Sequence, residues 1–189
     1  MKRVPIGVSA RHVHLSEEHI SILFGTGYEL KPFKPLSQPG EFSAQETVIV
    51  EGPSGKFENV RILGPARSRT QIEISRTDSY TLGIPAPLRD SGDLDGTPGA
   101  VIRGPNGAVT LQEGVIVSAR HIHLHTKDAE AWNIRDRQLL RVRVGGERSL
   151  IFENVMARIS DRFALNMHID TDEANACGVK TGDLAEILD

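Results

Sequence analysis

The sequence predicts a mostly β protein, with short strands arranged in barrels or sandwiches, a few short helices and two similar modules. Eighteen glycines and ten prolines are spread along the chain and divide it into short pieces. The pieces between them are rich in Val and Ile, which favour strands. One phrase, SARHVHL beginning at Ser9, returns as SARHIHL at Ser118 with a single Val to Ile change. Many short strands with frequent turns favour a barrel or sandwich over a doubly wound sheet.

Nine runs are predicted as strands, because each is brief and is bounded by turn residues such as GPSG, RGPNG or GG. In chain order the runs are VPIGVSA, ETVIVEG, KFENVRIL, TQIEIS, AVIRG, GVIVSA, LLRVRVGG, LIFENVMARI and LAEILD.

Helical signals are few. SEEHISILFG begins with Ser16 as a predicted N-cap and continues with an acidic first turn. TKDAEAWN follows the second copy of the repeated phrase, with Thr126 as its predicted cap. A third helix is predicted in TDEANACG, from Thr171 to Gly178, where a glycine ends it.

The repeated phrase organises the chain. In both copies a β-like run enters, two histidines follow and a short capped helix comes next, and the copies lie 109 residues apart (His12 and His121). A duplicated strand–HxH–helix unit predicts two modules that face each other in a pseudo-twofold relation. The boundary between them is expected near Ala119.

Length, charge and cysteine content exclude several classes of protein. The 189 residues suffice for one domain or two small ones with a real core. A net charge of −3 argues against a nucleic-acid binder, although a small basic pocket for an anion is compatible with it. The lone Cys177 forms no internal disulfide. The chain enters its first motif at once, which leaves no room for a signal peptide, and no apolar run approaches the roughly 20 residues of a membrane helix. A soluble, cytoplasmic protein is expected.

The HxH pairs are candidate metal ligands. Residues i and i+2 of a strand share one face, so His12 and His14 present two imidazoles side by side, and His121 and His123 do the same. Neutral imidazoles on a rigid strand suit zinc and other first-row ions. A single HxH is also compatible with a pair of exposed histidines, but its repetition within one phrase favours ligands. The arginine that precedes each pair, Arg11 or Arg120, is compatible with anchoring backbone, phosphate or an acidic partner.

Two histidines do not complete a catalytic zinc site, which typically has three protein ligands. His168, in LNMHIDTDEAN, and Glu73, in TQIEIS, are the further candidates. Alternation along the predicted strand places Glu73 on one face with Gln71 and Ser75, where a carboxylate is able to bridge two metals or simply to face solvent. Two other histidines are interpreted as structural or surface residues; they are His19 and His125.

The longer stretches of the chain resemble one known family. SARHVHLS, the segment from QPGEFSAQ to DLDGTPG (38–99), GVIVSARHIHL and HIDTDEANA are similar to the PduL-type phosphate propanoyltransferases, which are phosphotransacylases of propanediol utilisation and related systems. The likeness covers nearly the entire chain and is least distinctive around residues 125–165.

The resemblance implies a fold of two β-barrels capped by short helices, in which the first strand crosses into the C-terminal barrel. One barrel then comprises residues 1–10 and 119–189, and the other comprises residues 11–118. The resemblance also implies a dinuclear zinc centre between the barrels.

The site residues that the resemblance implies follow from matching motifs. The metal ligands are His12 and His14 for one ion and His121, His123 and His168 for the other, with Glu73 as the bridge. Arg67, in GPARSRTQ, matches the arginine that holds phosphate near the metals. The residues that match coenzyme A contacts are Ser9, Lys34, Arg61, Leu63 and Asn175. Asn166 stands where an acidic residue is expected in relatives, which alters the surroundings of His168.

The reaction that the resemblance implies converts acyl-CoA and phosphate reversibly to acyl phosphate and CoA. Phosphate held at the metals and by Arg67 is the expected nucleophile, so no acyl-enzyme is required and Cys177 is interpreted as a small buried residue. A binuclear hydrolase that cleaves a thioester or phosphoester is the enzymatic alternative. A metal-stabilised module of a protein shell is the non-enzymatic one.

Several properties stay open from the sequence: the acyl-chain length, the metal identity and the direction of the reaction in its pathway. The resemblance is compatible with a homodimer. Relatives that enter bacterial microcompartments carry an amphipathic N-terminal extension, whereas this sequence begins at the barrel, so a microcompartment location is expected only if such an extension has been removed.

Overall fold

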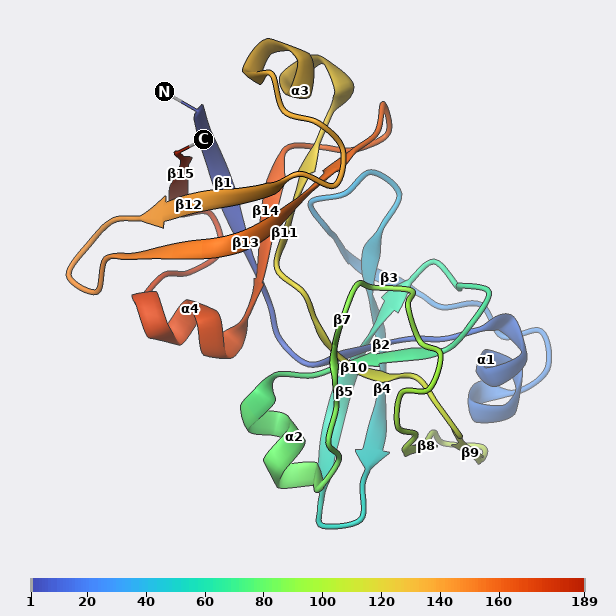
Figure 1. Cartoon of the computed structure of the whole chain (residues 1–189). Helices are drawn as coiled ribbons and strands as arrows, with labels where there is room; N and C mark the ends of the chain where they lie inside the picture. Colours follow the sequence, from blue (N-terminus) through green and yellow to red (C-terminus); the bar gives the residue numbers. More distant parts are fainter. Residues whose placement is uncertain (1, 189) are drawn as a thin grey trace. The chain divides into compact units, whose positions relative to one another are not determined.

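The structure is a computed structural model that describes residues 2–188, and most of its regular elements are strands (Figure 1). The described chain forms two compact units. The barrel unit contains residues 2–10, 37–39 and 119–188, and the open-sheet unit contains residues 11–36 and 40–118. The prediction of a mostly β protein with few helices is confirmed.

The barrel unit is a closed barrel of six strands within the described residues. In barrel order these are β1 (Lys2–Ser9), β14 (Asn166–Asp170), β11 (His121–Leu124), β13 (Leu150–Ile159), β12 (Leu139–Val144) and β15 (Leu184–Ile187), which pairs back with β1. The helices of this unit are α3 (Thr126–Trp132) and α4 (Thr171–Cys177).

The first strand joins the C-terminal strands, as the resemblance implied. β1 runs parallel to β14, with Gly7 opposite His168, and antiparallel to β15, with Arg3 opposite Glu186 (Figure 1). This pairing closes the barrel around a fully buried apolar core. Core side chains without solvent exposure include Val4, Ile6, Ile122, Leu124, Leu140 and Met167.

The open-sheet unit contains nine strands among the described residues. They are β2 (His12–His14), β3 (Pro32–Pro35), β4 (Phe42–Glu51), β5 (Lys56–Gly64), β6 (Gln71–Glu73), β7 (Leu88–Arg89), β8 (Val101–Arg103), β9 (Ala108–Thr110) and β10 (Val115–Ser118). The helices are α1 (Glu17–Phe24) and α2 (Arg76–Leu82).

The strands of this unit follow the order β7-β10-β6-β2-β5-β4-β8-β9, and β3 adds to β4. Where the resemblance implied a second barrel, the sheet is a curled half-barrel that does not close between its described ends. The end strands β7 and β9 are only two and three residues long, so they offer few backbone groups for closure. β2, which carries the first HxH, lies between β6 and β5 near the middle of the sheet.

The three predicted helices are present, and a fourth was missed. Ser16 caps α1 as predicted, and Gly178 ends α4 in the left-handed conformation. The N-cap of α3 is His125 rather than Thr126, because the His125 ring accepts the amide hydrogen of Lys127 at 3.1 Å. α2 follows a capping box and ends at a left-handed glycine, signals that the sequence also carried.

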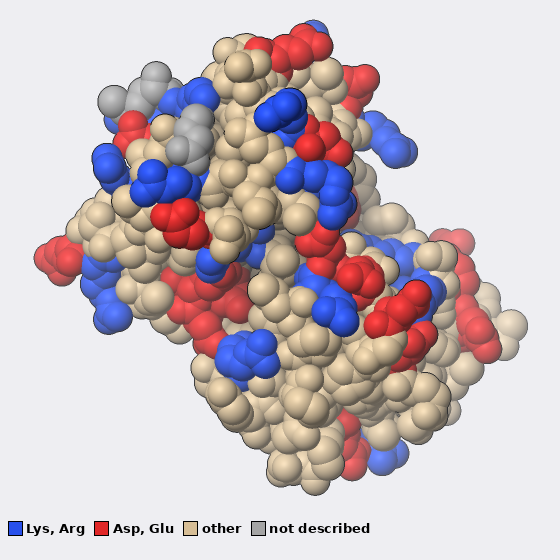
Figure 2. Space-filling model, viewed as in Figure 1, with Lys and Arg blue, Asp and Glu red and all other residues tan. Residues whose placement is uncertain are grey.

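The charge distribution on the surface and the length of the helices concern two classes of protein discussed above, nucleic-acid binders and membrane proteins. Acidic and basic side chains are interspersed on the face in view in Figure 2, in line with the small net charge. Across residues 2–188, no helix combines the length and the apolar character needed to cross a membrane.

We expect Ile122→Ala to lower the free energy of unfolding by about 2–5 kcal/mol, because it removes a fully buried side chain from the barrel core. Urea unfolding followed by circular dichroism measures the loss. Ile151→Ala on β13 of the same unit is the matched control, since that side chain is 40% exposed and its truncation should change the free energy of unfolding by only about 0.5 kcal/mol. Equal losses for the two variants would contradict the packing described for Ile122.

Candidate metal centres

The first HxH pair lies on β2 with its two imidazoles on one face. Val13, between them, points to the opposite face and is fully buried in the core of the open-sheet unit. β2 runs antiparallel to β6, which places His12 directly opposite Glu73 and His14 opposite Gln71. Side chains at directly opposite positions share a face and lie close together. The sheet register therefore brings a carboxylate to the imidazole pair.

His12, His14 and Glu73 form a compact cluster. The Glu73 carboxylate lies 3.7 Å from His12 Nε2 and 3.8 Å from His14 Nε2, and the two rings stand edge to face with their centroids 5.0 Å apart. A tetrahedral zinc with bonds of 2.0–2.1 Å needs ligand atoms about 3.3 Å apart. The cluster is therefore close to the spacing that one ion requires.

Hydrogen bonds orient the Glu73 carboxylate. Gln71 Nε2 donates to its Oε1 at 2.5 Å and the Ser91 hydroxyl donates to the same oxygen at 2.9 Å. Burial raises the pKa of Glu73, but the neighbouring histidines and the Ser91 hydrogen bond outweigh it and hold the pKa well below its usual range. The carboxylate is thus ionised and held in a fixed orientation. Its bridging role stays a prediction.

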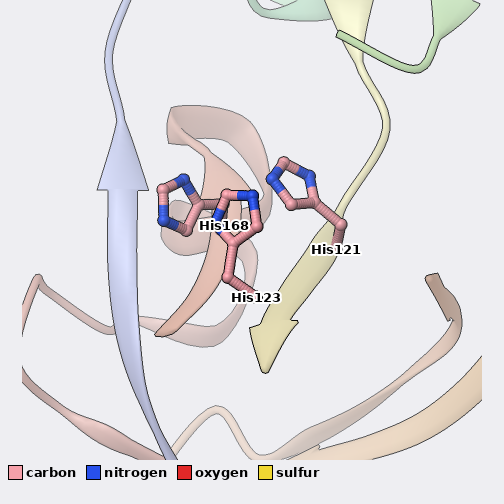
Figure 3. Close-up of side chains that lie close together, drawn as sticks. All are labelled: His121, His123 and His168. Atoms are coloured by element: carbon pink, nitrogen blue, oxygen red, sulfur yellow. The ribbon is translucent and has the colours of Figure 1, made fainter. Parts of the chain in front are cut away.

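The second cluster repeats this arrangement in the barrel unit. His121 and His123 share one face of β11, and Ile122 between them enters the core. β11 runs antiparallel to β14, which places His121 directly opposite His168. Figure 3 shows the three imidazoles gathered beside these two strands. Their ring centroids lie 4.8–5.1 Å apart.

The chemistry of these clusters fits divalent metal ions. In each one the candidate ligand atoms lie within 4.8 Å of one another. Burial, His12 and Arg67 lower the pKa of His14 to about 3. Burial and the charges of His121, His168 and Arg158 lower the pKa of His123 to about 2. Both rings therefore stay neutral and keep a lone pair for a metal at physiological pH.

Hydrogen bonding supports the same reading. His121 Nδ1 lies 2.8 Å from the Ala119 carbonyl, which fixes the tautomer and leaves Nε2 as the ligand atom. His14 Nδ1 and His123 Nδ1 are buried polar atoms for which the described residues provide no hydrogen-bond partner. Such orphaned nitrogens are costly unless a ligand or a small adjustment satisfies them. Each cluster is compatible with holding one metal ion.

Arg67, predicted to hold phosphate, is connected to the first cluster. Its Nη1 donates to Ser91 Oγ at 3.1 Å, and Ser91 donates in turn to Glu73. Its Nη2 lies 3.6 Å from Glu41 Oε1, and about a third of each side chain is exposed. Sequence reasoning missed Ser91 and Glu41 as members of this network. Both lie in the stretch 38–99 that carries the family resemblance, but nothing in their local pattern singles them out.

The predicted coenzyme A contacts fall into two groups, one in each unit. In the open-sheet unit, Lys34 on β3 and Leu63 on β5 pair with Ser43 of β4 from its two sides. Arg61 of β5 donates to two backbone carbonyls of β4 and lies over the ring of Phe33. In the barrel unit, Ser9 ends β1 and Asn175 lies in α4.

The remaining candidates have structural roles. His19 Nδ1 lies 2.6 Å from the Thr70 hydroxyl, and His125 caps α3. Cys177 is buried, and burial raises the pKa of its thiol, which makes it a poor nucleophile. Asn166 is buried on β14, directly opposite His123. The strand of Glu73 ends before Ser75, which caps α2 instead of continuing the strand face.

Comparison with known proteins identifies the family. The family model described as phosphate propanoyltransferase matches residues 5–180. The chain belongs to the phosphate propanoyltransferase family. It is an enzyme of that family, and the resemblance noted from its motifs is confirmed.

Curated relatives are similar over nearly their whole length. A phosphate propanoyltransferase of Thermotoga maritima is 56% identical over 185 residues, which is 97% of this chain and 88% of the relative. A protein of the same name from Enterococcus faecalis is 51% identical, and the match covers 97% of this chain and 87% of the relative. One from Listeria monocytogenes is 49% identical, and the match covers 98% of this chain and 87% of the relative.

We expect the metal-free protein to lose stability as the pH falls from about 6.5 to 4.5, in part through His14. The pKa of His14 is about 3 in the folded chain and near 6.5 when exposed, so in this window the unfolded chain binds a proton that the folded chain does not. The contribution is fully present above pH 6.5 and is lost progressively below it. Melting temperatures of wild type and His14→Gln across this window measure the effect.

The variant lacks the titrating ring, so its melting temperature should fall less steeply with pH. The window ends at pH 4.5 because the low pKa of Glu73 adds a loss in the same direction only below its ordinary value of 4.5. If the melting temperatures of the two proteins fell equally steeply with pH, His14 would not be buried in its neutral form.

Proposed function

We propose that the protein transfers a propanoyl group or a related short acyl group from coenzyme A to inorganic phosphate, reversibly. One observation supports this most directly: the family match coincides with two clusters of three metal-ligating side chains, one in each unit. We propose zinc as the ion of each cluster, because imidazole nitrogen and carboxylate oxygen are ligands that zinc accepts. A homodimer and an association with a microcompartment stay predictions.

When bound by these clusters, a divalent ion would supply positive charge that offsets the charge of phosphate and helps to polarise the thioester carbonyl. The side chains of the chain itself do the positioning. Arg67 offers a planar guanidinium able to bind two phosphate oxygens, and the Ser91 hydroxyl ties it to the oriented Glu73. Burial lowers the pKa of His14 and of His123, so these two rings stay neutral and avoid repelling a metal.

In the proposed reaction, a phosphate oxygen attacks the carbonyl carbon of the thioester, and the carbon–sulfur bond then breaks. The products are acyl phosphate and the CoA thiolate, which takes a proton from solvent to become the free thiol. Phosphate is a weak nucleophile, so its orientation and charge neutralisation are the main tasks of the site. Cys177 takes no part, because its thiol is buried and its pKa is raised. We place Lys34, Arg61, Leu63, Ser9 and Asn175 at coenzyme A.

We expect His121→Ala and Glu73→Gln each to reduce bound zinc from about two equivalents to about one and to abolish transfer, because each removes one of three ligands from a cluster. Elemental analysis and a phosphate-dependent CoA-release assay measure the two effects. His125→Asn is the control: that ring caps α3 outside both clusters, and Asn caps helices well. Full activity in a variant that has lost metal would refute the role of the clusters.

We expect Arg67→Ala to raise the phosphate KM roughly 10- to 100-fold while zinc content stays unchanged, because a charge-assisted hydrogen bond contributes about 1.5–3 kcal/mol. Arg103→Ala is the control, since Arg103 belongs to the same unit but pairs with Glu51 at the surface. Normal phosphate kinetics in Arg67→Ala would remove its assigned role.

The same assay separates transfer from hydrolysis. CoA release that proceeds equally well without phosphate would favour the binuclear hydrolase, whereas strict phosphate dependence favours the transferase. The shell-module alternative has no support, because the chain belongs to an enzyme family.

A further inference from the structure

The arginine that precedes each HxH pair has the same partner type in both units. Arg11 Nη2 donates to Asp78 Oδ1 at 2.6 Å, and Arg120 Nη1 donates to Glu173 Oε1 at 2.8 Å. Asp78 is buried, and Glu173 is mostly shielded from solvent. The sequence left backbone, phosphate or an acidic group open as partners of these arginines. In the structure both pair with an acidic side chain, and Arg120 Nε also donates to the backbone carbonyl of Glu153 at 2.8 Å.

Each carboxylate serves two partners with its two oxygens. Asp78 Oδ2 accepts the backbone amide hydrogen of Ser75 at 3.3 Å, and Glu173 Oε2 accepts that of Asp170 at 3.0 Å. Ser75 and Asp170 are the N-caps of α2 and α4, and both helices begin with a complete capping box. One carboxylate oxygen therefore accepts a hydrogen bond from the N-cap amide, and the other accepts one from the arginine.

A phenylalanine completes the arrangement in both units. The guanidinium of Arg11 lies 4.1 Å from the ring centre of Phe57, and that of Arg120 lies 5.3 Å from the ring centre of Phe152. Both rings begin the same four-residue sequence, FENV, and its asparagine has a positive φ in each copy, 58° and 55°. A cation over an aromatic face is attracted to it, so each guanidinium is held from two sides. We call the arginine, the carboxylate and the phenylalanine of one unit a brace.

Each brace spans the two strands that carry the metal ligands of its own unit. The arginine directly precedes the first histidine of the pair, and the helix cap that its carboxylate holds follows the third ligand by two residues. The first and third ligands are themselves direct partners across the antiparallel strands: His12 with Glu73, and His121 with His168. The brace thus connects the two strands at the end where the paired ligands lie.

Both units keep a complete capping box, but the residues that form it differ between the two copies. The carboxylate is Asp in one and Glu in the other, the cap is Ser or Asp, and the third ligand is Glu or His. The arginine and the phenylalanine are nevertheless the same in both units. In both, one carboxylate oxygen accepts from the arginine and the other accepts from the backbone amide of the N-cap residue. What is common to both units is a fixed connection between the first and third ligands.

We infer that Arg11 and Arg120 are positioning residues, each of which holds the first and third metal ligands of its own cluster at binding distance. The inference rests on the proposed function in one respect, namely that the two clusters bind metal. It adds that metal affinity at each cluster depends on an arginine that does not itself touch the ion.

The test compares zinc binding by Arg11→Gln, Arg120→Gln and wild type. Each metal-free protein is titrated with zinc in competition with a chromophoric chelator. Loss of a group that orients metal ligands typically weakens affinity 10- to 100-fold. We expect one of the two zinc equivalents to weaken by that amount in each variant while the other stays at its wild-type affinity. Cobalt identifies the cluster, because a three-histidine site and a two-histidine, one-carboxylate site have different visible spectra.

Matched controls are available in both units. Arg143→Gln in the barrel unit and Arg103→Gln in the open-sheet unit remove surface ion pairs, with Glu186 and Glu51, that lie outside the braces. Both should retain two tight equivalents. Glu173→Gln keeps an oxygen for the amide of Asp170 but loses the charge that holds Arg120, so it should reproduce the effect of Arg120→Gln. Arg120→Lys should restore part of the affinity.

Stability of the metal-free proteins separates positioning from folding. Circular dichroism and thermal unfolding should show brace variants that remain folded, with melting temperatures within a few degrees of the controls. Unchanged zinc affinity in both glutamine variants would overturn the inference while leaving the proposed function intact. Equal weakening of both equivalents, together with a large loss of stability, would also overturn it. A wild-type protein that binds no metal would defeat the proposed function and this inference with it.

Discussion

The alternation of side chains along a strand is the constraint on which both ligand clusters depend. In β2 and β11 it sends two imidazoles to one face and commits the branched side chain between them, Val13 or Ile122, to a fully buried core. Burial of that apolar residue opposes a register slip, because a shift by one residue would expose it and drive the histidines into the core. The core of each unit thus fixes the direction in which its ligands point, and the neighbouring antiparallel strand supplies the third ligand from the position directly opposite.

The sequence predicts a strand correctly where the local pattern of residues is enough to define it. All nine predicted runs coincide with strands of the structure, because Val, Ile and flanking turn residues define them without reference to the rest of the chain. The short strands β3, β7 and β9 were not predicted, since they have two to four residues and little apolar pattern. β14, which carries His168, was not among the predicted runs either. The polar helix α2 was missed because its only strong signal is its caps. Pairing of β1 with β14 and β15 joins distant segments, so periodicity alone gives no indication of it.

The residues of the candidate site also differ in whether local sequence pattern predicts them. The HxH pairs are local, and their repetition marks them in the sequence, whereas Glu73 and His168 acquire their place only through sheet register. Ser91 and Glu41 lie in connections between strands, and only tertiary structure brings them to Arg67. The two clusters also differ in composition, since one contains a carboxylate and the other contains only imidazoles. Bound divalent ions would therefore keep different net charges, which makes the two positions chemically unequal despite their common geometry.

The placement of β1 has a consequence for biosynthesis. β1 precedes every other described strand in the sequence, and one of its two neighbours in the barrel, β15, follows all of them. On the ribosome, the nascent β1 emerges before both of its partners, so its two edges stay unpaired until β14 and β15 have been translated. The open-sheet unit meets no such delay, because residues 11–118 complete it. It is therefore the part able to fold first.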